Sequence, residues 1–404
     1  MANVSSSNGL EKRPKLRFPG FDEPWKPVIL SSILHERNEY AEKDGTYEHA
    51  TLSKEGIYGK TARYDRDFLV SIENKKYKVT HYNDLCYNPA NLKFGVICLN
   101  KYGDAIFSPI YVTFEVDEGA DVDFIGANVT RWDFINHALR FQQGTVYERM
   151  AVSPEDFLSI QCYLPSKNEQ VHISSLIRVL DNRIEKQQSY VDALKKYKRG
   201  AVRYLLSPKS CPLKNARWTT AKLGELGSFV KGAPLSKADI SEDGTPFILY
   251  GELYTTYNEV VTSVKRRTQA QVDELFLSRV GDVVIPTSGE TSEEISTASC
   301  VMLPGVILAG DLNIFRSDKV DGRIMSYLLN HVVNAKIARI AQGKSVVHIQ
   351  ASELGKLTLS YPDENTQKKL IDFLSKFDDK IVIEENALTF LTGLKEGLMQ
   401  QLFI

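Results

Sequence analysis

Residues 165–206 read PSKNEQVHISSLIRVLDNRIEKQQSYVDALKKYKRGAVRYLL, and this stretch recurs near the end of the chain. Residues 362–403, PDENTQKKLIDFLSKFDDKIVIEENALTFLTGLKEGLMQQLF, can be laid over it without a gap at a shift of 197 residues. Identical residues fall in register along the overlap: Pro165 on Pro362, Gln170 on Gln367, Asp181 on Asp378, Ile184 on Ile381, Leu194 on Leu391, Gly200 on Gly397 and Leu205 on Leu402. A repeat of this kind indicates that the chain consists of two copies of one half-length unit.

Apolar residues in both copies follow the heptad spacing of a coiled coil. The seam of the first copy is Ile173, Ile177, Leu180, Ile184, Val191 and Leu194. The seam of the second copy is Leu370, Leu374, Phe377, Ile381, Leu388 and Leu391. One polar residue interrupts each seam at the same place, Gln187 in the first and Glu384 in the second. The pattern predicts two long spacer helices, residues 165–206 and 362–404.

The charges of the two predicted helices favour pairing with each other. The first has nine Lys and Arg against four Asp and Glu, whereas the second has five against eight, and opposite charges attract across an interface. The block between the helices leaves the end of the first and enters the start of the second, so we predict an antiparallel pair with an approximate twofold axis. One alternative stays open, in which each stripe is only the core face of a helix in its own domain.

The two blocks outside the helices, residues 16–164 and 216–361, also correspond. The matches are Trp25 with Trp218, Leu30 with Leu223, Ile33 with Leu226, Asp84-Leu85-Cys86 with Asp282-Val283-Val284, Phe114 with Phe315, Asn136-His137 with Asn330-His331, and Gly144 with Gly343. Runs such as 107–116, 282–286 and 306–315, broken by Gly, Pro and Asn, predict strands, and 131–142 and 323–341 predict helices.

The predicted fold is therefore α+β. Two similar α+β domains are separated by a pair of long antiparallel coiled-coil helices, and the whole chain is a pseudo-twofold internal repeat. Residues 1–15 are expected to be a disordered N-terminal tail and residues 207–215 a linker, because both have the Ser, Pro and Lys bias of segments outside a core.

Composition limits the class of protein. In a chain of 404 residues, 43% hydrophobic and 25% charged residues are typical of a soluble globular protein of two or three domains. The formal net charge of −1 argues against a wholly basic coat protein for nucleic acid. No apolar run has the length of a membrane span or signal peptide, so we expect a cytoplasmic protein. The five cysteines are far apart and never spaced as CxxC, so we expect neither a disulfide framework nor a zinc site. We also expect no other metal and no cofactor.

The order of domain, helix, domain and helix resembles the specificity subunits of type I restriction-modification systems over nearly the entire chain. The duplicated helices are the most specific sign, and the short motifs are individually weak. These motifs are Leu16-Arg17-Phe18-Pro19-Gly20-Phe21, the run from Tyr77-Lys78-Val79 to Tyr87-Asn88-Pro89, Gly281-Asp282-Val283-Val284, and the segment from Pro362 to Ile381 with Gln367, Leu374 and Asp378.

The resemblance implies a DNA-recognition subunit without a catalytic centre. Its two target recognition domains, residues 16–164 and 216–361, would each read one half of a bipartite site in double-stranded DNA. Two adenine methyltransferase subunits would dock on the helices, and two ATP-dependent restriction subunits would bind through them. Helices of about 35 residues would span about 50 Å, which exceeds one duplex turn of about 34–36 Å, so base pairs between the readers would go unread.

Candidate DNA contacts are basic side chains for phosphates and polar side chains for base edges. In the first domain they are Lys54, Lys60, Arg63, Lys75, Lys76, Lys78, Asn88, Asn91, Lys93, Gln143 and Thr145. In the second they are Lys231, Lys237, Lys265, Arg266, Arg267, Thr287, Ser288, Gln342, Lys344 and Ser345. Each of these residues taken alone can equally be a solvated charge or a turn residue, so the clusters are stronger candidates than their members.

Two other polar groups have competing interpretations. The basic run at the end of the first helix, Lys195, Lys196, Lys198 and Arg199, either complements the helix dipole, follows DNA, or contacts the methyltransferase subunit. The pairs Asn136-His137 and Asn330-His331 are interpreted as structural polar groups, because no cysteine or carboxylate accompanies them at metal-ligand spacing.

Familiar enzyme motifs are missing from the sequence. It has no GxxxxGK[ST], GxSxG or HExxH element, and Asn88-Pro89-Ala90 lacks the second proline and the aromatic residue of an amino-methyltransferase loop. Two alternatives remain: a coiled-coil adaptor that binds protein partners only, and a degenerate DNA-modifying enzyme. The adaptor predicts no salt-dependent DNA affinity, and the enzyme predicts activity of the purified chain with a methyl donor.

Overall fold

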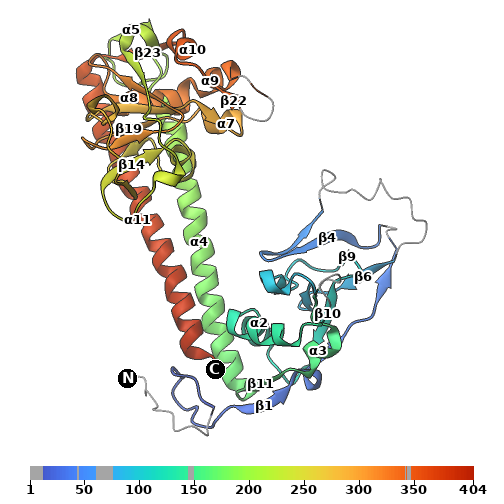
Figure 1. Ribbon diagram of the computed structural model, residues 1–404. Coiled ribbons are helices and arrows are strands. Elements are labelled where there is room, and N and C mark those ends of the chain that lie inside the picture. Colours follow the sequence, from blue (N-terminus) through green and yellow to red (C-terminus); the bar gives the residue numbers. More distant parts are fainter. Residues whose placement is uncertain (1–11, 43–44, 61–75, 144–149, 342, 344–346) are drawn as a thin grey trace. The chain divides into compact units, whose positions relative to one another are not determined.

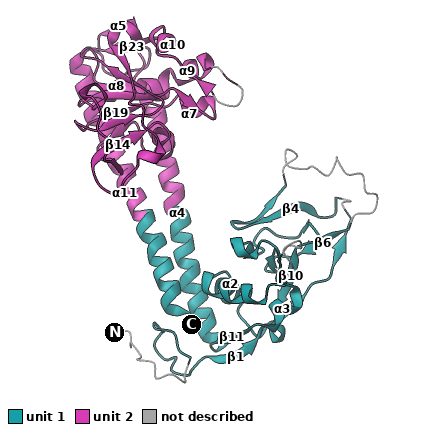
Figure 2. Ribbon diagram, in the orientation of Figure 1, with its two compact units in different colours: residues 1–186, 388–404 teal, residues 187–387 magenta. Residues whose placement is uncertain are grey.

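A computed structural model of the chain describes residues 12–42, 45–60, 76–143, 150–341, 343 and 347–404. The chain divides into two compact units (Figure 2). Unit 1 consists of residues 1–186 and 388–404, and unit 2 consists of residues 187–387. Of the expected tail, residues 1–15, residues 1–11 lie outside the described residues. The carbonyl oxygen of Lys12 accepts a hydrogen bond from the backbone N–H of Trp25 at 2.9 Å.

Two long helices correspond to the repeated segments. Helix α4 covers Lys167–Leu205 and helix α11 covers Glu364–Leu402, and they appear green and red in Figure 1. Each runs through both units, and the α4 and α11 segments pack against each other within each unit. In unit 1, Ile173 and Ile177 share a core with Leu402 and Phe403. In unit 2, Val202 and Leu206 share a core with Leu370 and Leu374. The pair is therefore antiparallel, as predicted.

The described residues of unit 1 form one four-stranded and one five-stranded sheet, in the orders β2-β10-β7-β8 and β3-β6-β9-β4-β5, and the pair β1-β11. Its elements are β1 (Lys26–Ile29), β2 (Leu34–Glu36), β3 (Tyr40–Ala41), β4 (Glu48–Ser53), β5 (Gly56–Gly59), β6 (Tyr77–Thr80), β7 (Leu85–Tyr87), β8 (Ile97–Leu99), β9 (Ala105–Phe107), β10 (Val112–Val116), α1 (Val122–Val129), α2 (Trp132–Ala138), α3 (Pro154–Ser159) and β11 (Gln161–Leu164).

Unit 2 contains sheets in the orders β13-β21-β17-β19-β15 and β16-β14-β20, with the pairs β12-β23 and β18-β22. Its elements are β12 (Trp218–Lys222), α5 (Leu223–Leu226), β13 (Ser228–Lys231), β14 (Thr245–Leu249), α6 (Glu252–Thr255), β15 (Val260–Val261), β16 (Arg266–Thr268), β17 (Asp282–Pro286), β18 (Ser288–Gly289), α7 (Ser292–Ile295), β19 (Ser299–Val301), β20 (Ile307–Ala309), β21 (Leu312–Arg316), α8 (Gly322–Tyr327), α9 (Asn334–Ile340), β22 (Val347–His348), α10 (Ala351–Gly355) and β23 (Thr358–Pro362).

The two units repeat the same core register. Phe114 of β10 lies opposite Leu85 of β7, and Phe315 of β21 lies opposite Val283 of β17. These are the residues that correspond in the sequence, and all four side chains are buried. The α+β class and the internal repeat are thus confirmed. The predicted runs 107–116 and 306–315 are each two strands, since a turn closed by Tyr111 interrupts the first and Gly310, at φ +76°, interrupts the second.

One glutamine ties each long helix to its own unit in the same way. The side-chain oxygen of Gln170 accepts from the backbone N–H of Asp121 at 2.9 Å, and its Nε2 donates to the carbonyl oxygen of Pro165. Gln367 makes the equivalent bonds with Asp321, at 2.8 Å, and with Pro362. Both glutamines are buried, so the bonds hold the start of each helix against the first turn of α1 or α8.

Candidate nucleic-acid interface

The seam residues of the two helices are buried or half-buried. Ile173, Ile177 and Val191 of α4 are buried, as are Leu370, Leu374 and Ile381 of α11. The rest of the seam is half-buried: Leu180, Ile184, Leu194, Phe377, Leu388 and Leu391. Ion pairs between the two helices flank the seam, as expected from their opposite net charges. Lys195 of α4 contacts Glu385 of α11 at 2.6 Å, and Lys395 of α11 contacts Asp181 of α4 at 2.5 Å.

In unit 1, most described candidates lie at the surface. Lys54 occupies the turn between β4 and β5, and Lys60 follows β5 and is half-buried. Lys76 and Asn91 are exposed, as is Lys93, which lies 5.1 Å from the ring centroid of Phe94. Gln143 is exposed and donates to Asp156 at 3.2 Å. Arg63, Lys75 and Thr145 lie outside the described residues.

Two candidates of unit 1 turn out to be internal. The side chain of Lys78 is 2% exposed, and its Nζ contacts Glu36 at 3.2 Å and Asn38 at 2.8 Å. Asn88 is buried, and its side-chain oxygen accepts from the backbone N–H groups of Ala90 and Asn91. Both groups are therefore used inside the fold, so we withdraw these two residues as surface contacts for DNA.

In unit 2, Lys231, Lys237, Lys265 and Arg267 are exposed, and Thr287 and Arg266 are half-buried. Ser288 is buried, and its hydroxyl bonds to Asp311 at 2.9 Å and to His348 at 3.0 Å, so it too is withdrawn as a free contact. Gln342, Lys344 and Ser345 lie outside the described residues. Lys237, Arg266 and Ser288 line one cleft of about 810 Å³, so the fold gathers three candidates that are far apart in the sequence.

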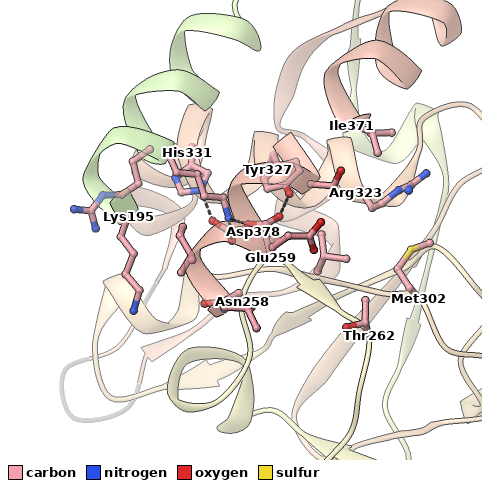
Figure 3. Close-up of a pocket in the computed structure, with 17 residues that line it drawn as sticks. Lys195, Asn258, Glu259, Thr262, Met302, Arg323, Tyr327, His331, Ile371 and Asp378 are labelled. Carbon is pink, nitrogen blue, oxygen red and sulfur yellow. Dashed lines mark hydrogen bonds and ion pairs between the residues drawn. The ribbon is translucent and has the colours of Figure 1, made fainter. Parts of the chain in front are cut away.

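Two lysines of the basic run at the end of the first spacer helix, Lys195 and Lys198, form ion pairs within the chain. Lys198 of α4, with a side chain 6% exposed, contacts Glu259 at 2.6 Å and also pairs with Asp378 of α11. Tyr327 donates to Asp378, and His331 bonds to Glu259 (Figure 3). We call Lys198, Glu259, Tyr327, His331 and Asp378 the buried charge cluster. It lines a cavity of about 470 Å³.

Burial and the neighbouring charges shift the pKa values of the buried charge cluster in opposite directions. The charges prevail for Glu259 and Lys198, and burial prevails for Asp378. Burial alone raises the pKa of Glu259, but the hydrogen bond from His331 and the charge of Lys198 lower it to about 2. Burial raises the pKa of Asp378 above its ordinary value. Burial also lowers the pKa of Lys198, but the charges of Glu259 and Asp378 outweigh this and raise it. The cluster therefore joins α4, α11 and α8 as a charged, hydrogen-bonded core. Sequence reasoning missed Glu259, because no spacing or motif marks it.

No group of three or more His, Cys, Asp or Glu side chains in the described ranges could hold a metal ion. None of the described helices combines the length and apolar character needed to cross a bilayer.

Comparisons with known proteins identify the second half of the chain. Residues 215–392 match the family model described as "Type I restriction modification DNA specificity domain". This half belongs to the type I restriction-modification DNA specificity domains. For residues 215–392, the match confirms the DNA specificity domain that the sequence resemblance implies, and it does not favour a protein-only adaptor. No curated protein matches the chain in sequence.

Solved structures show the same fold over the whole chain. The S subunit of a type I restriction-modification system from M. genitalium is 16% identical, with a TM-score of 0.57, over 97% of this chain and 99% of that one. A chain from work on complex assembly and conformational transition of the type I R-M system is also 16% identical. Its TM-score is 0.56, over 94% of this chain and 96% of that one. The specificity-domain fold thus extends beyond residues 215–392 to the first half.

Proposed function

We propose that this chain selects the DNA site at which a type I complex acts in the cytoplasm, with no catalytic centre of its own. Residues 16–164 read one half of a bipartite site and residues 216–361 read the other half. The spacer helices, residues 165–206 and 362–404, set the number of unread base pairs and dock two adenine methyltransferase subunits. Two ATP-dependent restriction subunits bind through these methyltransferase subunits.

The observation that carries this proposal is the repeated attachment of helix to domain. Gln170 bonds to Asp121 as Gln367 bonds to Asp321, and each glutamine is buried at the start of its helix. Because equivalent bonds orient two similar domains on equivalent helices, each half is a reader of the same kind on its own rigid support. Two such readers suit a site with two separate halves.

Exposed aromatic and aliphatic side chains on the helices support a protein partner there. Tyr190, Tyr197 and Tyr204 follow one another at heptad spacing on α4 and are 45%, 66% and 54% exposed. On α11, Ile383 and Phe390 are 60% and 70% exposed. Apolar residues left at the surface of a coiled coil mark contact sites, and we assign this contact to the methyltransferase subunits.

The test is methylome sequencing of cells that carry the chain and its methyltransferase subunit, compared with cells that lack the chain. We expect one bipartite methyl-adenine motif to disappear with the chain. Exchange of residues 16–164 for the first domain of another specificity subunit should change one half of that motif only. A motif that changes in both halves, or in neither, contradicts the modular assignment.

The binding of the assembled complex to DNA distinguishes the remaining alternatives. Affinity should fall steeply as salt rises, because lysine and arginine contacts to phosphates release counterions. An adaptor would show no such affinity. A degenerate enzyme would methylate DNA as the purified chain with a methyl donor, whereas we expect no methylation until the methyltransferase subunit is added.

A further inference from the structure

The cleft of about 810 Å³ in unit 2 brings together a charged pair and aromatic side chains. Arg266, on β16, faces Glu252 at the start of α6, and the ion pair between Arg266 Nε and Glu252 Oε1 is 3.0 Å long. Lys237, Tyr250 and Tyr254 also line this cleft. Most of the other lining side chains are polar or charged, and they include the carboxylates of Glu290 and Asp311.

Glu252 is held more firmly than a surface carboxylate. Its side chain is 4% exposed, and its Oε2 accepts a hydrogen bond from the backbone N–H of Leu249 at 3.0 Å. This carboxylate has one oxygen on the backbone and the other in an ion pair with Nε, so it limits the positions that the arginine head group can take. The arginine itself stays 37% exposed, so its guanidinium is oriented and still accessible.

The neighbouring arginine provides a contrast. Successive side chains of a strand point to opposite faces, so Arg267 is turned away from the face that carries Arg266. Its Nη1 donates to the carbonyl oxygen of Gly244 at 2.8 Å, and it does not line the cleft. For Arg266, the described residues provide an ion pair at Nε and no hydrogen bond at Nε, Nη1 or Nη2.

From this geometry we propose that Arg266 reads a guanine in the half-site recognised by residues 216–361, and that Glu252 is its positioning residue. An arginine whose Nε is engaged presents its two terminal nitrogens as a fork, and this fork matches O6 and N7 of guanine in the major groove. Lys237, on the wall of the same cleft, contacts a neighbouring phosphate. The inference rests on the proposed function, because it requires that unit 2 binds DNA.

The first test is methylome sequencing with Arg266→Ala in the complete complex. We expect the second half of the motif to accept other bases at one guanine position, with discrimination reduced about ten-fold or more, since one bidentate contact has about that effect. Arg266→Lys should lose the same discrimination, because lysine keeps the charge but lacks the fork. The matched control, Arg279→Ala, changes an exposed arginine of unit 2 that does not line the cleft, and it should leave the motif unchanged.

Glu252→Gln tests the positioning role. It keeps the shape of the side chain and removes the charge, so we expect partial relaxation at the same guanine position and nowhere else in the motif. A merely structural role would instead lower the methylation of every site equally. Such a uniform loss would overturn the role of Glu252.

A chemical probe covers the case in which Arg266→Ala folds poorly. Replacing the guanine by 7-deazaguanine removes N7, so the wild-type complex should bind the modified site about ten-fold more weakly, whereas the Arg266→Lys complex should bind both sites equally. If wild-type binding tolerates 7-deazaguanine at every guanine of the half-site, or if both Arg266 variants keep the wild-type motif, the inference is wrong. The proposed function fails separately, if no bipartite motif depends on the chain.

Discussion

Gln187 of α4 donates from its Nε2 to the carboxylate of Glu384 of α11 at 2.6 Å and to the backbone carbonyl oxygen of the same residue at 3.1 Å. These two residues occupy the same position in the two copies of the repeat, 197 residues apart. In an antiparallel pair of equivalent helices, a residue meets its own equivalent only at the centre. The polar interruption of both seams is thus one shared contact that marks the register of the pair.

Removal of this contact should destabilise the helix pair. Gln187→Leu leaves the largely buried Glu384 carboxylate without that donor, and we expect the free energy of unfolding to fall by about 1–3 kcal/mol. Replacement of both residues by leucine should recover most of this loss, because two apolar side chains fit the seam. Urea denaturation measures both effects. Gln188→Leu, at an exposed neighbouring position, is the control and should change the stability little. A double variant whose free energy of unfolding is as low as that of Gln187→Leu would contradict this account.

The buried charge cluster predicts a large difference between two lysines of the same helix. Lys198→Met leaves Glu259 and Asp378 without their shared cation, which should cost about 3–5 kcal/mol of unfolding free energy. Lys195→Met removes an ion pair whose lysine is 44% exposed, so its cost should stay below about 1 kcal/mol. Chemical denaturation followed by circular dichroism measures the two midpoints. Equal shifts would show that the cluster adds no more than a surface pair.

The low pKa of Glu259 predicts a dependence of stability on acid. This pKa is about 2 in the folded chain against an ordinary 4.5. A lowered folded pKa contributes stability that is complete above about pH 4.5 and is lost as the pH falls towards 2. The difference in unfolding free energy between the wild-type chain and Glu259→Gln should therefore shrink by up to about 3 kcal/mol over that window. Denaturation at a series of pH values checks this. A difference that stays constant down to pH 2 would disprove the shift.

The length of the helices should control the number of unread base pairs. One heptad inserted into each helix, next to Gln187 and Glu384, keeps the seam in phase and lengthens the pair by about 10 Å. This corresponds to about three base pairs at about 3.4 Å each. Methylome sequencing should then show the same two half-sites with about three more bases between them. A four-residue insertion in one helix only should abolish the motif, because the seams no longer match.

Much of the fold could be predicted because its signals are periodic and local. The heptads predicted α4 and α11 to within two residues at each N-terminus, and Phe114 and Phe315 marked equivalent strands. The candidate contacts were harder to predict. Lys78 and Lys76 are two residues apart, yet the first is buried beside Glu36 and the second is exposed. The local sequence does not indicate which lysine will contact a carboxylate on another strand.

The sequence by itself therefore determined the duplication and the antiparallel helix pair, because heptad spacing and an ungapped repeat depend only on the order of residues. Only the tertiary structure decided which charges are internal. It paired Gln187 with Glu384, enclosed Lys198 between Glu259 and Asp378, and held Arg266 against Glu252. Partners such as Lys198 and Glu259 are 61 residues apart in the chain. The environment of a charged side chain depends on neighbours that folding brings to it, and this environment separates a structural ion pair from a group that can read DNA.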